Sequence, residues 1–220
     1  MDFNVDSVKS YLEEMNKQGY KEELLKDYYF EPDDLVEIQK QITDIENDNF
    51  SNPSEKGRAL ENLARSLFCF KNLFNVQTNI FTSTNEVDLL LIPNPGTLNI
   101  MEVFFRDICG FNLIGECKNY NDKIGVTWIG KVHSLLKVHN YNICVLFSRH
   151  GFTGKKWEDG KGLARKVALK ENIFILDITF NDLNKLEKKT IFDLITEKYN
   201  DIYHDIDYSA FLTTHPSERK

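Results

Sequence analysis

The sequence predicts an α/β protein with a helical segment in front of its main domain. Short, continuous apolar runs, typical of buried strands, occur at residues 89–92, 142–148 and 173–177. Apolar residues recur at helical spacing in residues 53–71 and 126–138, before and between these runs. Because strands alternate with helices of this length in α/β proteins, the order favours that class.

Length and composition place the chain among ordinary globular proteins. Its 220 residues, 41% hydrophobic and 28% charged, suffice for one well-packed domain with an appendage. The four cysteines lie in apolar contexts without CxxC spacing, so we expect free thiols, no zinc site and a reducing, cytoplasmic location. The acidic start and the lack of a bilayer-length apolar run predict neither export nor membrane insertion.

The chain divides into three predicted segments. Residues 1–50 form an acidic helical region, residues 51–180 the main domain, and residues 181–220 C-terminal helices with a frayed tail. In the first segment, helical spacing links Val8, Tyr11, Leu12 and Met15, and then Leu35, Ile38, Ile42 and Ile45. The polar residues 47–53 predict a linker. The acidic helices are suited to packing, to dimerisation or to a partner protein, and the sequence does not choose among these.

The net charge of −7 is unevenly distributed. It comprises −9 in residues 1–50, +4 in residues 51–180 and −2 in residues 181–220. Seven basic residues lie between Arg149 and Lys170, a candidate phosphate-facing surface. The candidate nucleic-acid-binding residues are Lys155, Lys156, Trp157, Lys161 and Arg165. The alternative is that these charges form the solvated face of a helix at residues 162–170.

Candidate site residues begin on the helix predicted at residues 53–71, with Ser54 as its N-cap. At 100° per residue, Glu61 lies at the edge of the apolar stripe of this helix. Its carboxylate can therefore lean toward the sheet, or it can be an ordinary surface glutamate. The spacing leaves both interpretations open.

An acid pair and a lysine follow on two predicted strands. Asp88 is the only charge embedded in its apolar run, and Glu116 and Lys118 share one strand face because side chains alternate along a strand. Cys117 then points to the other face. An acid and an amine inside a sheet are costly unless a metal, a partner or water compensates, so the set is a candidate site. A solvated strand face is the alternative.

The segment between these strands is longer than a hairpin needs. Asn94, Pro95 and Gly96 predict a turn, and residues 100–111 form an apolar insert. For Asp88 to face Glu116, this insert must let the two strands meet.

Glu61, Asp88 and the run Glu116-Cys117-Lys118 together resemble the PD-(D/E)XK nuclease superfamily, in particular the Mrr-like restriction endonucleases. The resemblance covers about residues 54–182, including a Gly-Phe-Thr turn at residues 151–154. It implies a restriction-endonuclease-like αβββαβ core with a mixed central sheet flanked by helices. Val87 stands where the superfamily name has proline.

The resemblance also implies an activity, the Mg²⁺-dependent hydrolysis of DNA phosphodiester bonds in restriction or phage defence, with Mn²⁺ as a substitute ion. Asp88, Glu116 and the Cys117 carbonyl would hold the cation, and Glu61 would tune the site or help to bind a second metal. Lys118 would position the attacking water and offset charge in the transition state. Because one such core cuts one strand, the resemblance implies a homodimer.

Other functions compete with this hypothesis. The chain could be a non-cleaving nucleic-acid-binding module, or a protein-interaction module whose acidic helices carry the function. Lys131 and His133 are both candidates for a supporting polar position after the lysine strand, and neither is assigned a catalytic role. The sequence lacks a GxSxG elbow, a paired-histidine zinc motif and a Gly-rich dinucleotide fingerprint, which argues against those enzyme classes.

Overall fold

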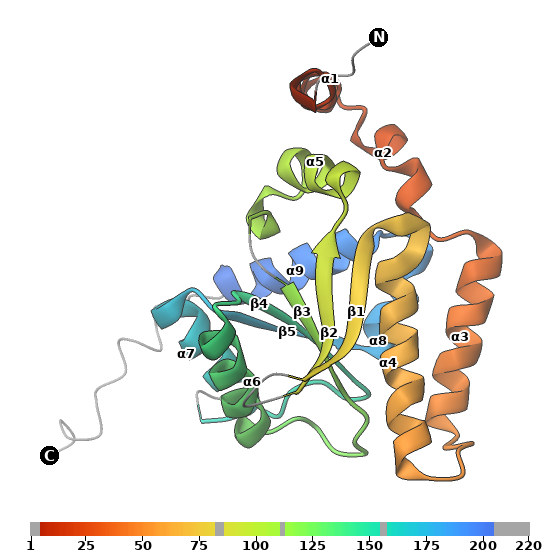
Figure 1. Cartoon of the computed structure of the whole chain (residues 1–220), viewed down its shortest axis with the longest axis vertical. Coiled ribbons are helices and arrows are strands. Elements are labelled where there is room, and N and C mark those ends of the chain that lie inside the picture. Colours follow the sequence, from red (N-terminus) through yellow and green to blue (C-terminus); the bar gives the residue numbers. More distant parts are fainter. Residues whose placement is uncertain (1–4, 82–85, 111–112, 155–157, 205–220) are drawn as a thin grey trace, which may run out of the picture.

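A computed structural model describes residues 5–81, 86–110, 113–154 and 158–204, and within these residues a five-stranded sheet is packed between helices (Figure 1). The strands are β1 (Phe74–Phe81), β2 (Glu86–Pro93), β3 (Leu113–Lys118), β4 (Ile143–Ser148) and β5 (Phe174–Thr179), and they lie side by side in this order. The β1–β2 and β2–β3 pairs are antiparallel, and β3, β4 and β5 are parallel. The α/β class that the sequence predicts is confirmed, with a mixed sheet.

The helices fall before, between and after the strands. They are α1 (Val5–Lys17), α2 (Lys21–Leu24), α3 (Pro32–Glu46), α4 (Pro53–Cys69), α5 (Pro95–Phe104), α6 (Val126–His139), α7 (Gly160–Glu171), α8 (Phe180–Leu183) and α9 (Ile191–Tyr203). The helices that the sequence predicts at residues 53–71, 126–138 and 162–170 are α4, α6 and α7. From α4 to β4 the chain runs helix, three strands, helix, strand, with α5 inserted between β2 and β3.

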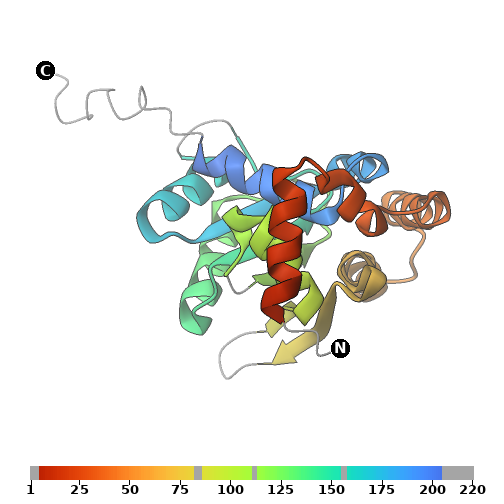
Figure 2. The same cartoon turned by 90° about the horizontal axis from the view of Figure 1, so that it is seen from above.

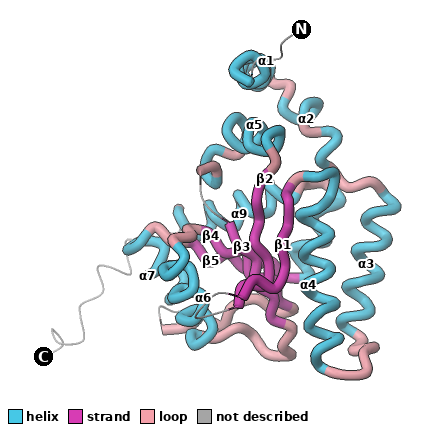
Figure 3. Tube along the Cα trace, viewed as in Figure 1, coloured by secondary structure: helices cyan, strands magenta, loops and turns pink. Residues whose placement is uncertain are grey.

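The two faces of the sheet are covered by different helices (Figure 3). Because side chains alternate along a strand, β4 contributes Val145 and Phe147 to one apolar cluster and Cys144 and Leu146 to another. The first cluster includes side chains of α3, α4 and α9, whereas the second includes those of α6 and α7. All six residues of β4 are buried, which explains its unbroken apolar run.

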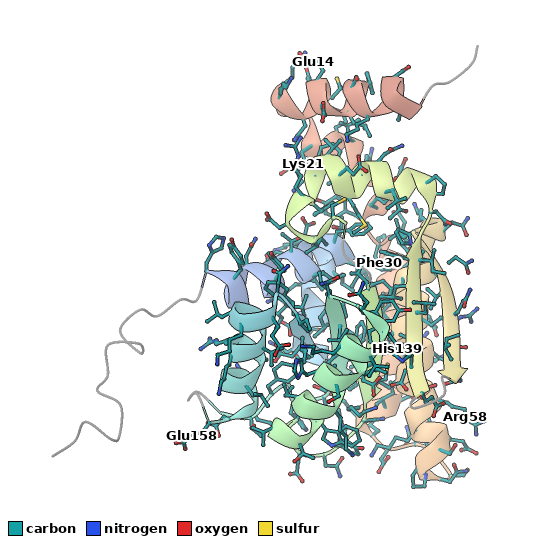
Figure 4. All side chains as sticks on the ribbon, turned by 60° about the vertical axis from the view of Figure 1, so that its left-hand side comes forward. Glu14, Lys21, Phe30, Arg58, His139 and Glu158 are labelled. Carbon is teal, nitrogen blue, oxygen red and sulfur yellow. The ribbon has the colours of Figure 1, made fainter. Side chains whose placement is uncertain are left out.

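The N-terminal helices occupy two places. Helix α3 buries Ile38, Ile42 and Ile45 in the same cluster as α4. Helix α1 instead lies over α5 (Figure 2), where Lys9 pairs with Glu102, and Arg106 contacts Glu13 at 3.5 Å. Glu14 points away from the body of the protein (Figure 4). The inserted helix α5 is therefore the element on which α1 packs.

Local details correct some sequence expectations. The turn predicted at residues 94–96 is wrong, because Pro95 opens α5, where its missing N–H costs no helical hydrogen bond. Helix α4 is capped by Asn52, whose side chain accepts from the Glu55 N–H at 3.0 Å, and not by Ser54. The tail predicted to fray, the last ten residues or so, lies outside the described residues, which end at residue 204.

Two further findings concern the cysteines and the helix lengths. Cys69, Cys109, Cys117 and Cys144 are free thiols. Among the described residues, no helix combines the length and the apolar character that a membrane span requires.

Candidate active site

Asp88 on β2 and Glu116 on β3 lie on adjacent strands, just beyond the last residue pair that joins the two strands. The β2–β3 pairing runs from Leu91 to Leu89, which lies opposite Gly115. A Cβ on Gly115 would come within 2.8 Å of the Leu89 side chain, so glycine permits this close approach. Beyond this pair the Asp88 side chain, and not its backbone, contacts β3: its Oδ2 accepts from the Cys117 N–H at 2.7 Å.

A distortion in the edge strand accompanies this orientation of Asp88. The β1–β2 pairing skips Asn79, which has a φ of +52° and lies in register with Asp88. On either side of Asp88, Val87 packs with the α6 and α7 cluster, whereas Leu89 packs with the α4 cluster. In a regular strand these two residues would share a face. The strand therefore rotates at Asp88, and the carboxylate turns toward β3.

The ammonium group of Lys118 lies between the two carboxylates. Its Nζ forms an ion pair with Glu116, lies 3.5 Å from Asp88 Oδ2 and donates to the Cys117 carbonyl at 3.2 Å. The structure thus brings Asp88 to Glu116 and Lys118, the two residues that strand alternation places on one face. The Lys118 and Asp88 side chains are only 12% and 14% exposed, so this ion cluster is largely shielded from solvent.

Burial controls the ionisation of this cluster. Glu116 is 7% exposed, and burial raises its pKa to about 7, with the charge of Asp88 adding to the effect and that of Lys118 opposing it. Burial alone would lower the pKa of Lys118, but the carboxylates of Glu116 and Asp88 outweigh it and raise that pKa. Lys118 therefore stays charged, whereas Glu116 exchanges its proton near neutral pH.

Glu61 on α4 and Cys117 on β3 both adjoin this cluster. Glu61 is half-buried, and its pKa is raised first by burial and then by the negative charges of Asp88 and Glu86. The Glu61 carboxylate is therefore close enough to Asp88 and Glu86 for their charges to raise its pKa. The Cys117 thiol points to the opposite face, where its Sγ lies 4.0 Å from the Leu60 carbonyl oxygen, so only the backbone of Cys117 is turned toward the lysine.

A cavity of about 560 Å³ opens beside Glu116. Its walls come from β2, β3 and α6, and they include Glu86, Glu116, Thr127, Trp128, Gly130, Lys131 and Ser134. Lys131, one of the two candidates for a supporting polar group, lines this cavity. The other candidate, His133, instead lies 3.3 Å from Glu171 on α7. Sequence reasoning missed Trp128 and Glu86, although Trp128 and Lys131 are three residues apart and so share a helix face.

The oxygen atoms of this cluster fit a hard cation. Glu116 Oε2 is buried and has no hydrogen-bond partner in the described structure, so it is an available ligand atom. Asp88 and the Cys117 carbonyl add two more oxygens, and Mg²⁺ is commonly held by one or two carboxylates and several waters. Among the described residues, no group of three or more His, Cys, Asp or Glu side chains is gathered as a metal site. The fit therefore depends on two carboxylates and a backbone carbonyl.

Two of the predicted nucleic-acid-binding residues lie away from this cavity. Lys155, Lys156 and Trp157 fall outside the described residues. Lys161 and Arg165 lie on α7 and line a second cavity, of about 400 Å³, which Asp177 and Lys198 also line. Neither residue lines the cavity beside Glu116.

Comparisons with protein-family models, with curated proteins and with solved structures found no match. A functional conclusion therefore depends on the geometry and the chemistry of the site.

Proposed function

We propose that the chain is a metal-dependent endodeoxyribonuclease that hydrolyses DNA phosphodiester bonds at Asp88, Glu116 and Lys118. The observation that carries the proposal is the position of the Lys118 ammonium between two shielded carboxylates, next to a cavity and to an unpartnered oxygen of Glu116. The element order from α4 to β4 supports a restriction-endonuclease-like core, as the resemblance to PD-(D/E)XK nucleases implies.

The proposed cofactor is Mg²⁺, with Mn²⁺ as a substitute. Asp88, Glu116 and the Cys117 carbonyl would hold the ion, and Glu61 would adjust the charge of the site or help to hold a second one. When bound, such an ion polarises a phosphoryl oxygen and lowers the pKa of water.

The protein residues would act by position and by charge. The Cys117 N–H fixes the Asp88 carboxylate by a 2.7 Å hydrogen bond, so this ligand is oriented before any substrate arrives. Lys118 keeps its proton, since its pKa is raised, and its ammonium offsets negative charge on the phosphoryl group in the transition state. It would also orient the attacking water.

Substrate, assembly and biological setting are parts of the same proposal. The substrate is DNA, and cleavage of both strands would require two protomers, so we propose a homodimer. The acidic N-terminal helices offer a surface for a partner protein. The proposed setting is cytoplasmic restriction or phage defence, which the resemblance suggests.

A cleavage assay with matched variants tests the proposal. Supercoiled plasmid and single-stranded DNA are incubated with Mg²⁺ or Mn²⁺ and with wild type, Asp88→Asn or the control Glu171→Gln, a carboxylate-to-amide change on α7. Wild type and Glu171→Gln should cleave, and Asp88→Asn should lose at least about a hundredfold in rate, as electrostatic active-site groups do. Equal traces for wild type and Asp88→Asn would refute the proposal. Binding without cleavage by wild type would instead favour the non-cleaving nucleic-acid-binding module.

A further inference from the structure

An aromatic ring lines the cavity beside Glu116. Trp128, on the first turn of α6, is half-buried, and its ring centroid lies 5.5 Å from that of Tyr120 at an interplanar angle of 35°. Tyr120 is 42% exposed and follows the strand that carries Glu116 and Lys118. The cavity therefore has an aromatic wall at Trp128, and Tyr120, two residues after the candidate catalytic lysine, packs against that ring.

The same ring is in contact with the cationic groups of the site. Lys118 Nζ, which pairs with Glu116, lies 5.0 Å from the Trp128 ring centroid, and Lys131 Nζ lies 4.3 Å from it. Both distances are within the range of cation–π contacts. Lys131 is exposed and ends a long, rotatable side chain, which a phosphate can draw away from the ring. The aromatic ring of Trp128 is thus in contact with two ammonium groups, which are suited to binding a phosphate.

The rest of the wall leaves room for a planar ligand. A Cβ on Gly130 would have no heavy atom within 4 Å, so α6 presents open space at Gly130, which lines the same cavity. The cavity volume of about 560 Å³ lies within the range of small-ligand pockets, roughly 300–1,000 Å³.

We propose that this cavity binds an unpaired DNA nucleotide, with its base stacked on Trp128 and its phosphate beside Lys118 and Lys131. The preferred substrate is then single-stranded or locally unpaired DNA. In a duplex each base is stacked on its neighbours, so a protein ring reaches a base face only after unstacking. Stacking on an aromatic side chain also tolerates every base, so this contact selects strand state and not sequence. The inference rests on the proposed function, which identifies the group beside Lys118 as a phosphate.

The intrinsic fluorescence of Trp128 gives a direct test that needs no cleavage. The chain has two tryptophans, so Trp157→Phe leaves Trp128 as the sole reporter. The variant is titrated in EDTA with an oligothymidylate of about eight nucleotides, a length that single-strand-binding sites cover, and with a blunt DNA hairpin. We expect the oligothymidylate to quench the fluorescence and to bind more tightly than the hairpin. If a saturating concentration of oligothymidylate leaves the fluorescence of Trp128 unchanged, the proposal is overturned.

Two further variants separate stacking from packing. Trp128→Leu keeps an apolar side chain without the ring, and it should weaken oligothymidylate binding by between about fivefold and about 150-fold, the usual effect of losing one stacked base, with hairpin binding unchanged. Gly130→Leu places a side chain in the open space, and leucine has a higher helix propensity than glycine, so α6 should still form. This variant should weaken oligothymidylate binding as Trp128→Leu does. The matched control is Gly96→Leu on α5, where a Cβ also meets no atom within 4 Å, and it should bind as wild type does.

The outcomes also distinguish this inference from the nuclease proposal. If Trp128→Leu and Gly130→Leu bind single strands as tightly as wild type while wild type cleaves DNA, the stacking site is refuted and the nuclease proposal stands. If Trp128 carries single-strand binding but wild type cleaves no substrate, the nuclease proposal fails and the cavity is a binding site alone.

Discussion

Cation binding at the candidate site should depend steeply on pH, because Glu116 must lose its proton to act as a ligand. Burial raises the pKa of this carboxyl to about 7, so it is mostly protonated in mild acid and mostly ionised above neutrality. For a pKa of about 7, the ionised fraction rises from roughly 3% near pH 5.5 to roughly 75% near pH 7.5. The affinity for a divalent cation should therefore rise about 25-fold over this interval and then level off.

Calorimetry with Mn²⁺ measures this dependence. Titrations in buffers with different ionisation enthalpies give the protons released per ion, and we expect about half a proton near pH 7, where half of the Glu116 carboxyls are protonated. The control is Glu116→Gln, which should bind more weakly at high pH and lose the pH dependence. A wild-type affinity that stays constant across the interval, with no proton released, would refute the account of Glu116 as a buried, protonated ligand.

Two predictions concern stability. Burial alone would raise the pKa of Asp182, but hydrogen bonds from Lys198 and Thr179 outweigh it and lower that pKa to about 2. Asp182→Asn should therefore reduce the free energy of unfolding by about 2 kcal/mol at neutral pH. The loss should become progressively smaller as the pH falls below about 4 toward 2. Urea denaturation that gives the same loss at neutral pH and at about pH 2 would contradict this. Gly115→Ala should cost about 1–3 kcal/mol, because its Cβ would lie 2.8 Å from the buried Leu89 side chain, and an unchanged thermal midpoint would disprove the close approach.

Much of the fold follows from apolar periodicity. The helix at residues 126–138 is predictable because it buries one face, and the strands at residues 142–148 and 173–177 are predictable because they bury both faces. Strand β1 is less visible, since Asn75, Gln77 and Thr78 are exposed at the sheet edge and leave no apolar run. Helix α5 is also hidden, because Asn94-Pro95-Gly96 is equally typical of a turn and of a helix start.

The site is predictable only in part. Strand alternation places Glu116 and Lys118 together, but the contact of Asp88 with the Cys117 N–H depends on the rotation of β2 beside Asn79. No periodic pattern marks that distortion. The cavity wall depends on how α6 turns as it packs on the sheet, which directs Trp128 toward Glu116. Sequence spacing alone cannot fix that rotation.

The most direct test of the central claim compares Lys118→Met with wild type in two assays, cation binding and DNA cleavage. Removing the ammonium from between the carboxylates leaves the oxygen ligands in place, so Mn²⁺ should bind at least as tightly as in wild type. Cleavage under saturating Mn²⁺ should nevertheless fall by at least about a hundredfold, since the charge that offsets the transition state is gone. Cleavage by Lys118→Met at the wild-type rate would contradict the account.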